Sequence, residues 1–266
     1  MPQKNKEGNS MKLAGIFVLL VLGLIILSVF FKLAFLIKNS KFDGTHKFNV
    51  LLITKDKQSI VSFSPTNKSF TMLLINDKEA KENLSKFLEI PIDGKIISKD
   101  NLSKDNLSFI FLKSVFPFGN VVEDLTIVDL IRLSVFLRTV PEAYIYEREI
   151  SDKLSQTQKS TIISLSFTDP TIDEENQSIE IINATKVYGA GGRLANLILH
   201  MGGNVVLITS ADNKEKISKI IYSGKVTYTV KKLSSYLNFA LEKKDKKSIA
   251  DVIIIIGTDR AESNKF

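Results

Sequence analysis

The side chains best suited to binding chemistry lie in one glycine-rich string, residues 181–193, with the sequence IINATKVYGAGGR. Its candidate binding residues are Asn183, Thr185, Gly189, Gly191, Gly192 and Arg193. A glycine-rich loop between a strand and a helix can hold a phosphate group at the N-terminus of that helix. The same residues can instead build a tight turn, with Asn183 and Thr185 holding it by side-chain hydrogen bonds. The string therefore predicts either a binding loop or a structural turn.

Nucleotide binding is an alternative that this string supports only in part. The dinucleotide fingerprint requires G-x-G-x-x-G and an acidic residue at the end of the next strand. Here the glycines run G-x-G-G, Leu194 takes the third glycine position, and Asp212 lies several residues beyond the expected strand. We therefore favour a turn that packs a helix closely on a sheet, and keep a nucleotide-reading membrane regulator as an alternative.

The sequence predicts no catalytic residue, no metal site and no cofactor. It has no cysteine, which excludes disulfides and thiolate chemistry, and His46 and His200 are its two histidines. No group of residues has metal-ligand spacing, and no G-x-S-x-G elbow is present for a serine nucleophile. His200 falls in the last turn of an expected helix, where a positive charge is favourable, so we interpret it as a helix-stabilising cation.

Charge and composition limit the classes of partner that can be expected. The net charge is +7, but the lysines are scattered and no basic stripe carries interleaved aromatic residues. Scattered lysines are typical of solvated surfaces, so no nucleic-acid partner is expected. About 220 residues follow the N-terminal apolar segment, which is enough for one large or two modest domains with their own cores.

The N-terminal apolar segment predicts one transmembrane helix. Residues 13–31 are all apolar or glycine apart from Ser28, and nineteen residues of helix span roughly 28 Å, close to the hydrocarbon thickness of a bilayer. A cleaved signal peptide is the alternative, but its apolar region is about 7–15 residues long and ends at an A-x-A-like site, which is absent here. Lysines lie on both sides of the segment, so the charge rule leaves its orientation open.

The elements that follow are expected to form a mixed α/β domain over residues 38–168. Apolar runs and alternation predict strands at 48–54, 59–64, 69–75, 95–98, 143–150 and 161–167. Helices are expected from Asp77 to Leu88, over 103–116, and from a cap at Asp124, the last being apolar nearly all round and therefore central. Residues 169–178, with Pro170 and a run of acidic residues, are predicted to be a linker.

The last part of the chain, residues 179–260, predicts a small β-α-β-β-α-β domain. Its expected strands are 179–183, 205–208, 219–222 and 250–256, and its expected helices are 191–201 and 230–241. The fold class is therefore α/β, with an N-terminal tail (1–12), a transmembrane helix and flank (13–37), a mixed α/β domain and this C-terminal domain.

The C-terminal segment resembles the C-terminal domain of LytR-type cell-envelope proteins over roughly residues 178–260. The resemblance rests on Asn183-Ala184-Thr185, Gly191-Gly192-Arg193, Gly202-Gly203 and the run from Ala250 to Asp259. The family usually has glycine where Ala184 stands. Proximity to cell-wall polymers is what this resemblance implies.

The middle segment resembles a LytR-CpsA-Psr (LCP) domain at 48–54, 60–75 and 87–94. Proteins of that family sit outside the membrane on one N-terminal helix and transfer glycopolymers from a polyprenyl pyrophosphate carrier to peptidoglycan. Pyrophosphate binding requires converging arginines and a magnesium carboxylate. Here only Asp77 occupies a comparable position, as a vestigial phosphate or metal site. Arg132, Arg138 and Arg148 fall on or just after the apolar helix, as ordinary surface charges.

Together these features favour a non-catalytic envelope protein with a degenerate LCP-like domain. It would be anchored in the lipid bilayer by residues 13–31, face outward, and bind or scaffold peptidoglycan or another wall glycopolymer. The alternative is an LCP-type transferase that uses lysines in place of arginines and requires Mg²⁺, with activity that depends on Asp77. Only the resemblance to these two families indicates that the domains after the transmembrane helix face outward.

Overall fold

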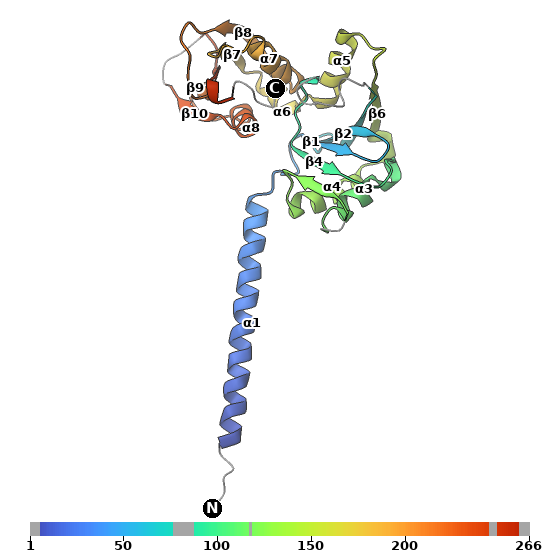
Figure 1. Ribbon diagram of the computed structural model, residues 1–266, viewed down its shortest axis with the longest axis vertical. Coiled ribbons are helices and arrows are strands. Elements are labelled where there is room, and N and C mark those ends of the chain that lie inside the picture. Colours follow the sequence, from blue (N-terminus) through green and yellow to red (C-terminus); the bar gives the residue numbers. More distant parts are fainter. Residues whose placement is uncertain (1–5, 77–87, 117–118, 245–248, 261–266) are drawn as a thin grey trace, which may run out of the picture.

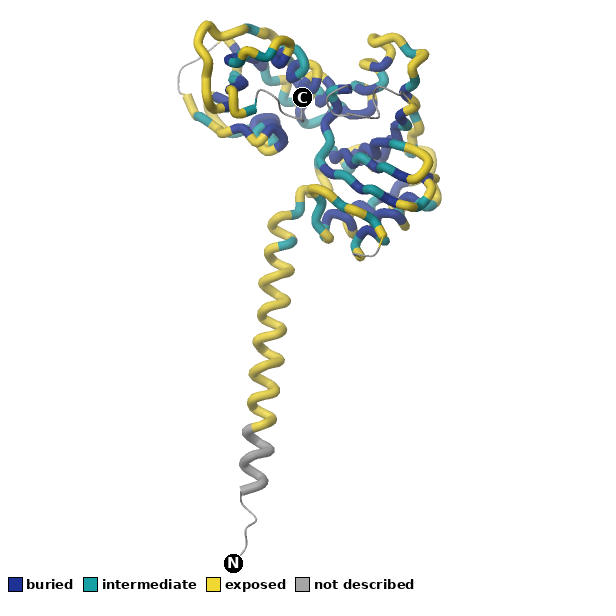
Figure 2. Tube along the Cα trace, viewed as in Figure 1, coloured by how far each residue is buried: buried dark blue, intermediate teal, exposed yellow. Residues whose placement is uncertain are grey.

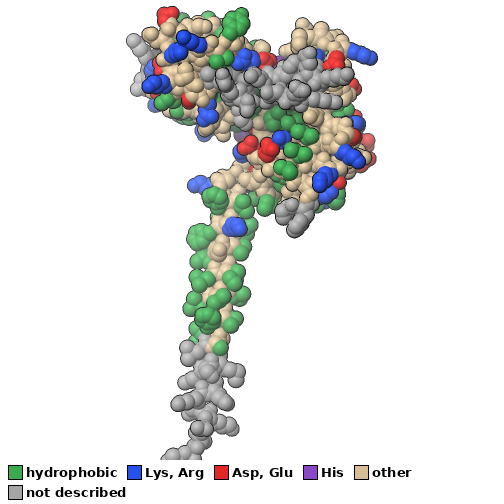
Figure 3. Space-filling view, in the orientation of Figure 1, with side chains coloured by type: hydrophobic (Ala, Val, Ile, Leu, Met, Phe, Trp, Pro, Cys, Tyr) green, Lys and Arg blue, Asp and Glu red, His purple; other side chains and the backbone are tan. Residues whose placement is uncertain are grey.

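A computed structural model describes residues 6–76, 88–116, 119–244 and 249–260, with side chains from Ala14 onward. One long helix, α1 (Lys6–Lys38), descends from a head made of two sheets (Figure 1). Within the described residues, α1 supplies the one helix, at Ala14–Lys38, that is long and apolar enough to cross a membrane. From Ala14 onward its side chains are exposed nearly throughout, and hydrophobic groups cover that part of the helix (Figures 2 and 3). The chain therefore carries one N-terminal membrane-anchor candidate.

The N-terminal half of the head is a six-stranded mixed sheet in the order β5-β4-β1-β2-β3-β6. Strands β1, β2 and β3 form an antiparallel meander, while β4 runs parallel to β1, and β6 parallel to β3. The strands are β1 (Phe48–Ile53), β2 (Gln58–Ser64), β3 (Ser69–Ile75), β4 (Gly94–Ile97), β5 (Val121–Glu123) and β6 (Ile145–Ile150). The predicted strands and hairpin between residues 48 and 98 are confirmed.

Helices cover both faces of this sheet. On one face α3 (Lys104–Lys113) and α4 (Ile127–Thr139) enclose a core that includes Phe63, Phe111 and Leu133. On the other face α5 (Gln156–Phe167) covers a second core with Ile60 and Phe167. A short 3₁₀ turn, η1 (Glu142–Tyr144), leads into β6.

Two expectations about α4 are wrong. Thr126, and not Asp124, caps the helix, because the Thr126 side chain accepts the Asp129 N–H and the Asp129 carboxylate accepts the Thr126 N–H. Asp124 lies two residues earlier in the left-handed region, at φ 62°. The helix is also not buried all round, since Ile131 and Val135 are exposed.

The segment from 151 to 178 also differs from expectation. Residues 161–167 belong to helix α5, which starts at a capping box formed by Ser155 and Gln158. Burial of Ile163 and Phe167, four residues apart, follows the helical period. The expected linker, 169–178, contains helix α6 (Pro170–Glu175). Residues 77–87, where a helix from Asp77 was expected, lie outside the described part of the chain.

The C-terminal domain is a five-stranded mixed sheet in the order β10-β9-β11-β7-β8. Its elements are β7 (Ser178–Asn183), α7 (Ala190–His200), β8 (Asn204–Ser210), β9 (Lys219–Tyr222), α8 (Tyr228–Leu237), β10 (Ala240–Lys243), β11 (Val252–Ile256) and η2 (Thr258–Arg260). The expected helix 230–241 ends early because Asn238 adopts a left-handed conformation, φ 57°. The freed residues form β10 beside β9. Apart from this added strand, the predicted α/β fold is confirmed.

Candidate functional site

The glycine-rich string forms the connection between β7 and α7, and its polar side chains hold the connection in shape. Asn183 Oδ1 accepts the Thr185 hydroxyl at 2.7 Å, and Asn183 Nδ2 donates to the Val187 carbonyl at 3.0 Å. The Val187 N–H in turn donates to the Thr185 hydroxyl. Gly189 lies in the left-handed region, φ 77°, immediately before the helix. The predicted structural turn is thus present, with the hydrogen bonds expected of it.

The same connection lines a pocket of about 450 Å³ at the carboxyl ends of β7 and β8. Five of the predicted residues line it: Asn183, Thr185, Gly189, Gly191 and Gly192. The sequence analysis missed the opposite wall, which is formed by the last residues of β8, Ile208 to Ser210. Because β8 pairs in parallel with β7, these residues lie beside the end of β7. Loop residues and strand ends together therefore make the pocket.

Tyr188 is the second feature that sequence reasoning missed. Its side chain is 99% exposed at the rim of the pocket. Arg193 does not line the pocket, and its guanidinium turns back to donate to the Tyr188 carbonyl at 3.4 Å. A free aromatic ring beside hydroxyl, amide and backbone groups can contact a sugar or a similar polar ring. The only signal for it in the sequence was a tyrosine within a glycine-rich loop.

Two glycines determine how much of the backbone the pocket exposes. A methyl group on Gly191 would come within 3.1 Å of Ile208, so this glycine permits close packing of α7 on β8. A methyl group on Gly192 would meet nothing within 4 Å, so packing does not require that glycine. The helix also begins without a side-chain cap, which leaves backbone N–H groups at its N-terminus available for hydrogen bonds.

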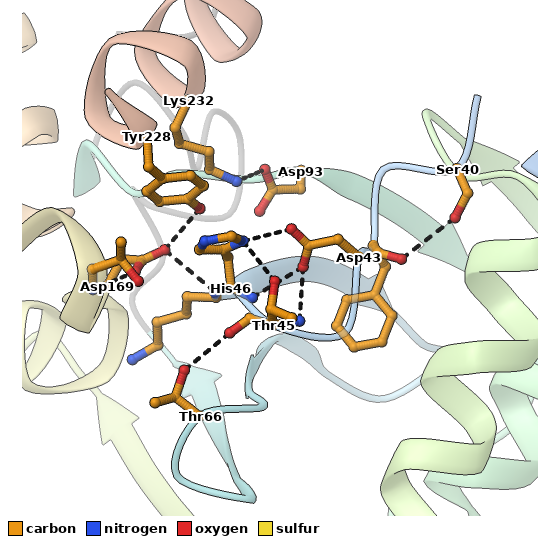
Figure 4. A network of polar contacts seen from close by, with 12 residues as sticks. Ser40, Asp43, Thr45, His46, Thr66, Asp93, Asp169, Tyr228 and Lys232 are labelled. Carbon is orange, nitrogen blue, oxygen red and sulfur yellow. Dashed lines mark hydrogen bonds and ion pairs between the residues drawn. The ribbon is translucent and has the colours of Figure 1, made fainter. Parts of the chain in front are cut away.

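A network of polar contacts lies at the junction between the two domains (Figure 4). The His46 ring stacks on Tyr228 of α8, with ring centroids 3.7 Å apart. Asp43 accepts hydrogen bonds from the His46 and Thr45 backbone. Burial alone would raise the pKa of Asp43, but hydrogen bonds from His46 and Thr45 outweigh it and hold that pKa at about 2. The carboxylate is therefore charged at neutral pH, as an acceptor for this turn.

Asp169 is the second centre of the junction and lies within the expected linker. It is buried, and it accepts the Tyr228 hydroxyl at 3.0 Å and the Lys47 N–H at 3.3 Å. Burial and then the charge of Asp169 raise the pKa of Tyr228. The tyrosine accordingly stays protonated and donates. These contacts have a structural role, because each group already has its partner.

His200 also serves the junction, which corrects its interpretation as a helix-stabilising cation. It is buried, its Nδ1 lies 2.9 Å from the Glu89 carbonyl, and its Nε2 lies 3.1 Å from the Ser160 hydroxyl. Burial lowers the pKa of His200, and the Glu89 carbonyl opposes that shift. A neutral ring that donates from Nδ1 and accepts at Nε2 fits both contacts.

A second pocket, of about 430 Å³, lies at the start of β6 on the face of the sheet that α5 covers. Lys47 and Arg148 line it together with hydroxyl side chains and Tyr146. Burial lowers the pKa of Lys47 to about 8, with Asp169 opposing the shift and Arg148 adding to it. Two cations beside hydroxyl donors can accept an anionic group. We refer to it as the basic pocket.

The three arginines considered for a pyrophosphate site do not converge. Arg132 donates to the Phe42 carbonyl at 3.0 Å, Arg138 donates to the Ser108 hydroxyl at 2.9 Å, and Arg148 lines the basic pocket. Asp77 lies outside the described residues. Among the described residues, no group of three or more His, Cys, Asp or Glu side chains has the arrangement of a metal site.

Comparison with known proteins identifies the C-terminal domain. Residues 176–259 match the family model described as LytR cell envelope-related transcriptional attenuator. That match spans β7 to η2, so the C-terminal domain is a LytR C-terminal domain, as the sequence predicted. It relates the chain to the cell envelope, and it does not extend to residues 38–168, where the LCP resemblance remains a hypothesis.

Two further comparisons add little. No curated protein matched the chain. Among solved structures, the chain was compared with a crystal structure of a fragment of a Listeria monocytogenes protein described as a transcriptional factor. The sequence identity is 11%, and the aligned region covers 68% of this chain and 87% of the Listeria chain. Its TM-score of 0.19 is too low to carry an argument about fold or function.

Proposed function

We propose that this protein is a membrane-anchored, extracytoplasmic envelope protein that binds a cell-wall glycopolymer without modifying it. The helix α1 would hold it in the bilayer, and the pocket between β7 and α7 would hold the polymer. Two findings support the setting, namely the membrane-anchor candidate and the LytR C-terminal domain.

The observation that carries the proposal is the composition of the β7–α7 pocket. Its walls supply amide, hydroxyl and backbone groups, and its rim supplies the exposed ring of Tyr188. Saccharides present hydroxyl groups around an apolar ring face, which such a surface complements. The residues that line the pocket include Lys186 and Tyr188 but no carboxylate and no histidine, so the pocket lacks the paired carboxylates that cleave glycosidic bonds. Binding without chemistry is the function this favours.

Retention of the full chain on purified peptidoglycan tests the proposal. Tyr188→Ala removes the exposed ring, and Gly192→Ala adds a methyl group that meets no protein atom within 4 Å. We expect both variants to lose most of the retention. Gly192→Ala should also gain about 0.5–1 kcal/mol of stability, since alanine has a higher helix propensity than glycine. That gain would separate a binding defect from a folding defect.

Ile249→Ala is the matched control for Tyr188→Ala. Ile249 is 88% exposed, and it precedes β11, whose start lies beside the amino end of the parallel strand β7, whereas the pocket lies at the carboxyl end of β7. We expect its retention to equal that of the unchanged protein. Equal retention of Tyr188→Ala, or no excess over an unrelated lysine-rich protein, would refute binding at this pocket.

A reporter fused after Phe266 tests the orientation, which the lysines around α1 leave open. We expect a reporter that works only outside the cytoplasm to be active. Activity of a reporter that works only in the cytoplasm would instead favour the nucleotide-reading regulator.

A further inference from the structure

Helices α3 and α4 carry an apolar outer surface. Each helix buries one side against the first sheet, through residues such as Phe111 and Leu133. Five large apolar side chains on these helices, and Phe116 three residues after α3, are nevertheless 36–60% exposed: Phe109, Leu112, Phe116, Ile127, Ile131 and Val135. We call these six residues the α3–α4 apolar face. Apolar patches of this kind on a soluble surface mark an interaction site.

The six residues form two neighbouring stripes. On α4 three of them recur every fourth residue, and on α3 Phe109 and Leu112 are three residues apart, so the helical members of each stripe lie on one side of their helix. Phe116 follows three residues after α3 ends at Lys113. The two helices pack side by side, with the Ser108 and Ser134 hydroxyls 3.1 Å apart and Arg138 donating to Ser108 at 2.9 Å. The two stripes therefore lie beside the contact between α3 and α4.

Hydrogen bonds fix α4 beside the end of α1. The buried carboxylate of Asp129 accepts the Ser40 hydroxyl at 2.7 Å and the Phe42 N–H at 2.8 Å. Arg132 donates to the Phe42 carbonyl from the same helix. Ser40 comes two residues after α1 ends at Lys38. Figure 1 accordingly places α3 and α4 at the lower end of the head, on the side from which α1 descends.

We infer that the α3–α4 apolar face rests on the lipid bilayer, as a second membrane contact beside the anchor. The inference rests on the proposed insertion of α1. An inserted α1 brings this face to the bilayer surface in every copy of the protein, so that no further partner is needed to cover it. Partly inserted apolar side chains with basic neighbours are typical of interfacial helices.

The charges around the α3–α4 apolar face favour anionic headgroups. Lys38, Lys41, Arg132 and Arg138 lie at the same end of the head, on α1, α4 and the segment between them. The acidic groups there include Asp124, which pairs with Lys41 at 3.5 Å, and the exposed Asp105 in the first turn of α3. Basic groups close to an anionic membrane surface strengthen attachment. With this face on the bilayer, β7, β8 and α7 lie at the far end of the head, away from the membrane (Figure 1).

Depth-dependent fluorescence quenching tests the inference on the full chain. The protein has no cysteine, so a single environment-sensitive label can be attached through Phe109→Cys or Ile131→Cys. The labelled chain is reconstituted in phosphatidylcholine–phosphatidylglycerol vesicles with plain or brominated acyl chains. We expect brominated chains to remove most of the fluorescence at both positions. The label on Leu165→Cys, 64% exposed on α5 at the other face of the sheet, should keep its signal.

A label on Leu33→Cys separates this inference from the proposed anchor. Quenching at Leu33 without quenching at Ile131 or Phe109 would overturn the membrane contact and leave the anchor standing. No quenching at Leu33 would overturn both. A label at Ile131 that is shielded from aqueous iodide but insensitive to brominated chains would assign the face to a second copy, and would also overturn the inference.

A charge variant provides the complementary measurement. Ile131 and Val135 are exposed, so Ile131→Asp with Val135→Asp should leave the fold intact. In the Phe109→Cys chain, we expect this pair of changes to abolish the quenching of the label, while Leu33→Cys with the same pair stays quenched. Unchanged quenching at Phe109 would contradict a bilayer contact made by both stripes.

Discussion

The ion pair between Lys232 and Asp93 provides a direct test of how the two domains are joined. Lys232 Nζ on α8 lies 2.7 Å from Asp93 Oδ1, and their side chains are 17% and 8% exposed. Asp93 precedes β4 in the first domain, and its second oxygen accepts the Asn49 N–H at 2.9 Å. One turn along α8, the Tyr236 hydroxyl accepts the Ile92 N–H at 3.1 Å. The pair therefore lies at the centre of a contact between domains.

The expected cost follows from burial. Removing one partner of a buried ion pair typically costs 3–5 kcal/mol, because the other charge is left without compensation. The Asn49 N–H still donates to Asp93 in Lys232→Met, so we expect about 3 kcal/mol. Asp93→Ala combined with Lys232→Met removes both charges and leaves only the Asn49 N–H without its acceptor, which costs about 1–3 kcal/mol. The double variant should accordingly be no less stable than Lys232→Met alone.

Urea unfolding of the full chain in detergent, followed by far-ultraviolet circular dichroism, measures these differences. Lys231→Met is the matched control, since Lys231 is the exposed neighbour of Lys232 on α8. We expect its unfolding free energy to change by less than about 0.5 kcal/mol. The Asp93→Ala single variant is measured as well. A cost below about 1 kcal/mol for Lys232→Met would refute the coupling, and so would a double variant whose cost equals the sum of the Lys232→Met and Asp93→Ala costs.

Three further predictions use the same unfolding assay. Asp129→Ala should lower the free energy of unfolding by about 3 kcal/mol. It removes a carboxylate that accepts hydrogen bonds from the N-cap of α4 and from the segment after α1. The control Asp105→Ala changes an exposed carboxylate and should cost less than about 0.5 kcal/mol. The pKa of Lys47 is about 8 in the folded protein against 10.5 ordinarily, so the unfolded chain binds more protons above pH 8. Stability should then rise by about 1.5 kcal/mol from pH 8 to 9.5 relative to Lys47→Met, and an equal pH dependence of the two proteins would contradict this. Gly257→Ala places a methyl group 2.6 Å from the Ile217 carbonyl carbon and should cost about 3 kcal/mol, because backbone must move; a neutral effect would disprove the clash.

Local sequence signals predicted the parts of the fold whose cause is local. The antiparallel β2–β3 hairpin follows from two apolar strands on either side of the turn at 65–68. The β7–α7 connection follows from its glycines together with Asn183 and Thr185, whose side chains bond within four residues of themselves. Interactions of such short range are encoded in a single stretch of sequence.

Errors arose where a strong local preference met a competing signal. Residues 161–167 contain β-branched and aromatic side chains that favour a strand, yet the Ser155–Gln158 capping box starts a helix that includes them. In α8 the early stop depends on the left-handed Asn238, and β10 forms because β9 offers an edge. Such an edge arises only from the tertiary structure.

The sequence predicted only part of the pocket and of the domain junction, because the remaining contacts also arise from the tertiary structure. The β8 wall of the pocket comes from residues about twenty-five positions beyond Asn183 and is placed there by parallel pairing. The Lys232–Asp93 contact joins residues 139 positions apart. No pattern in either segment points to the other. Contacts over such separations are set by strand pairing within a sheet and by packing between the two domains, and charge type alone does not specify a partner.

The segment that follows α1 links the anchor to both domains. Ser40 and Phe42 bond to Asp129 on α4, whereas His46 stacks on Tyr228 of α8. Within ten residues of the end of α1, the chain has therefore contacted a helix of each domain. A flexible tether would let the head rotate freely above a bilayer. Because this segment is bonded on both sides, insertion of α1 would set the direction of the whole head, with the β7–α7 pocket held away from the membrane (Figure 1).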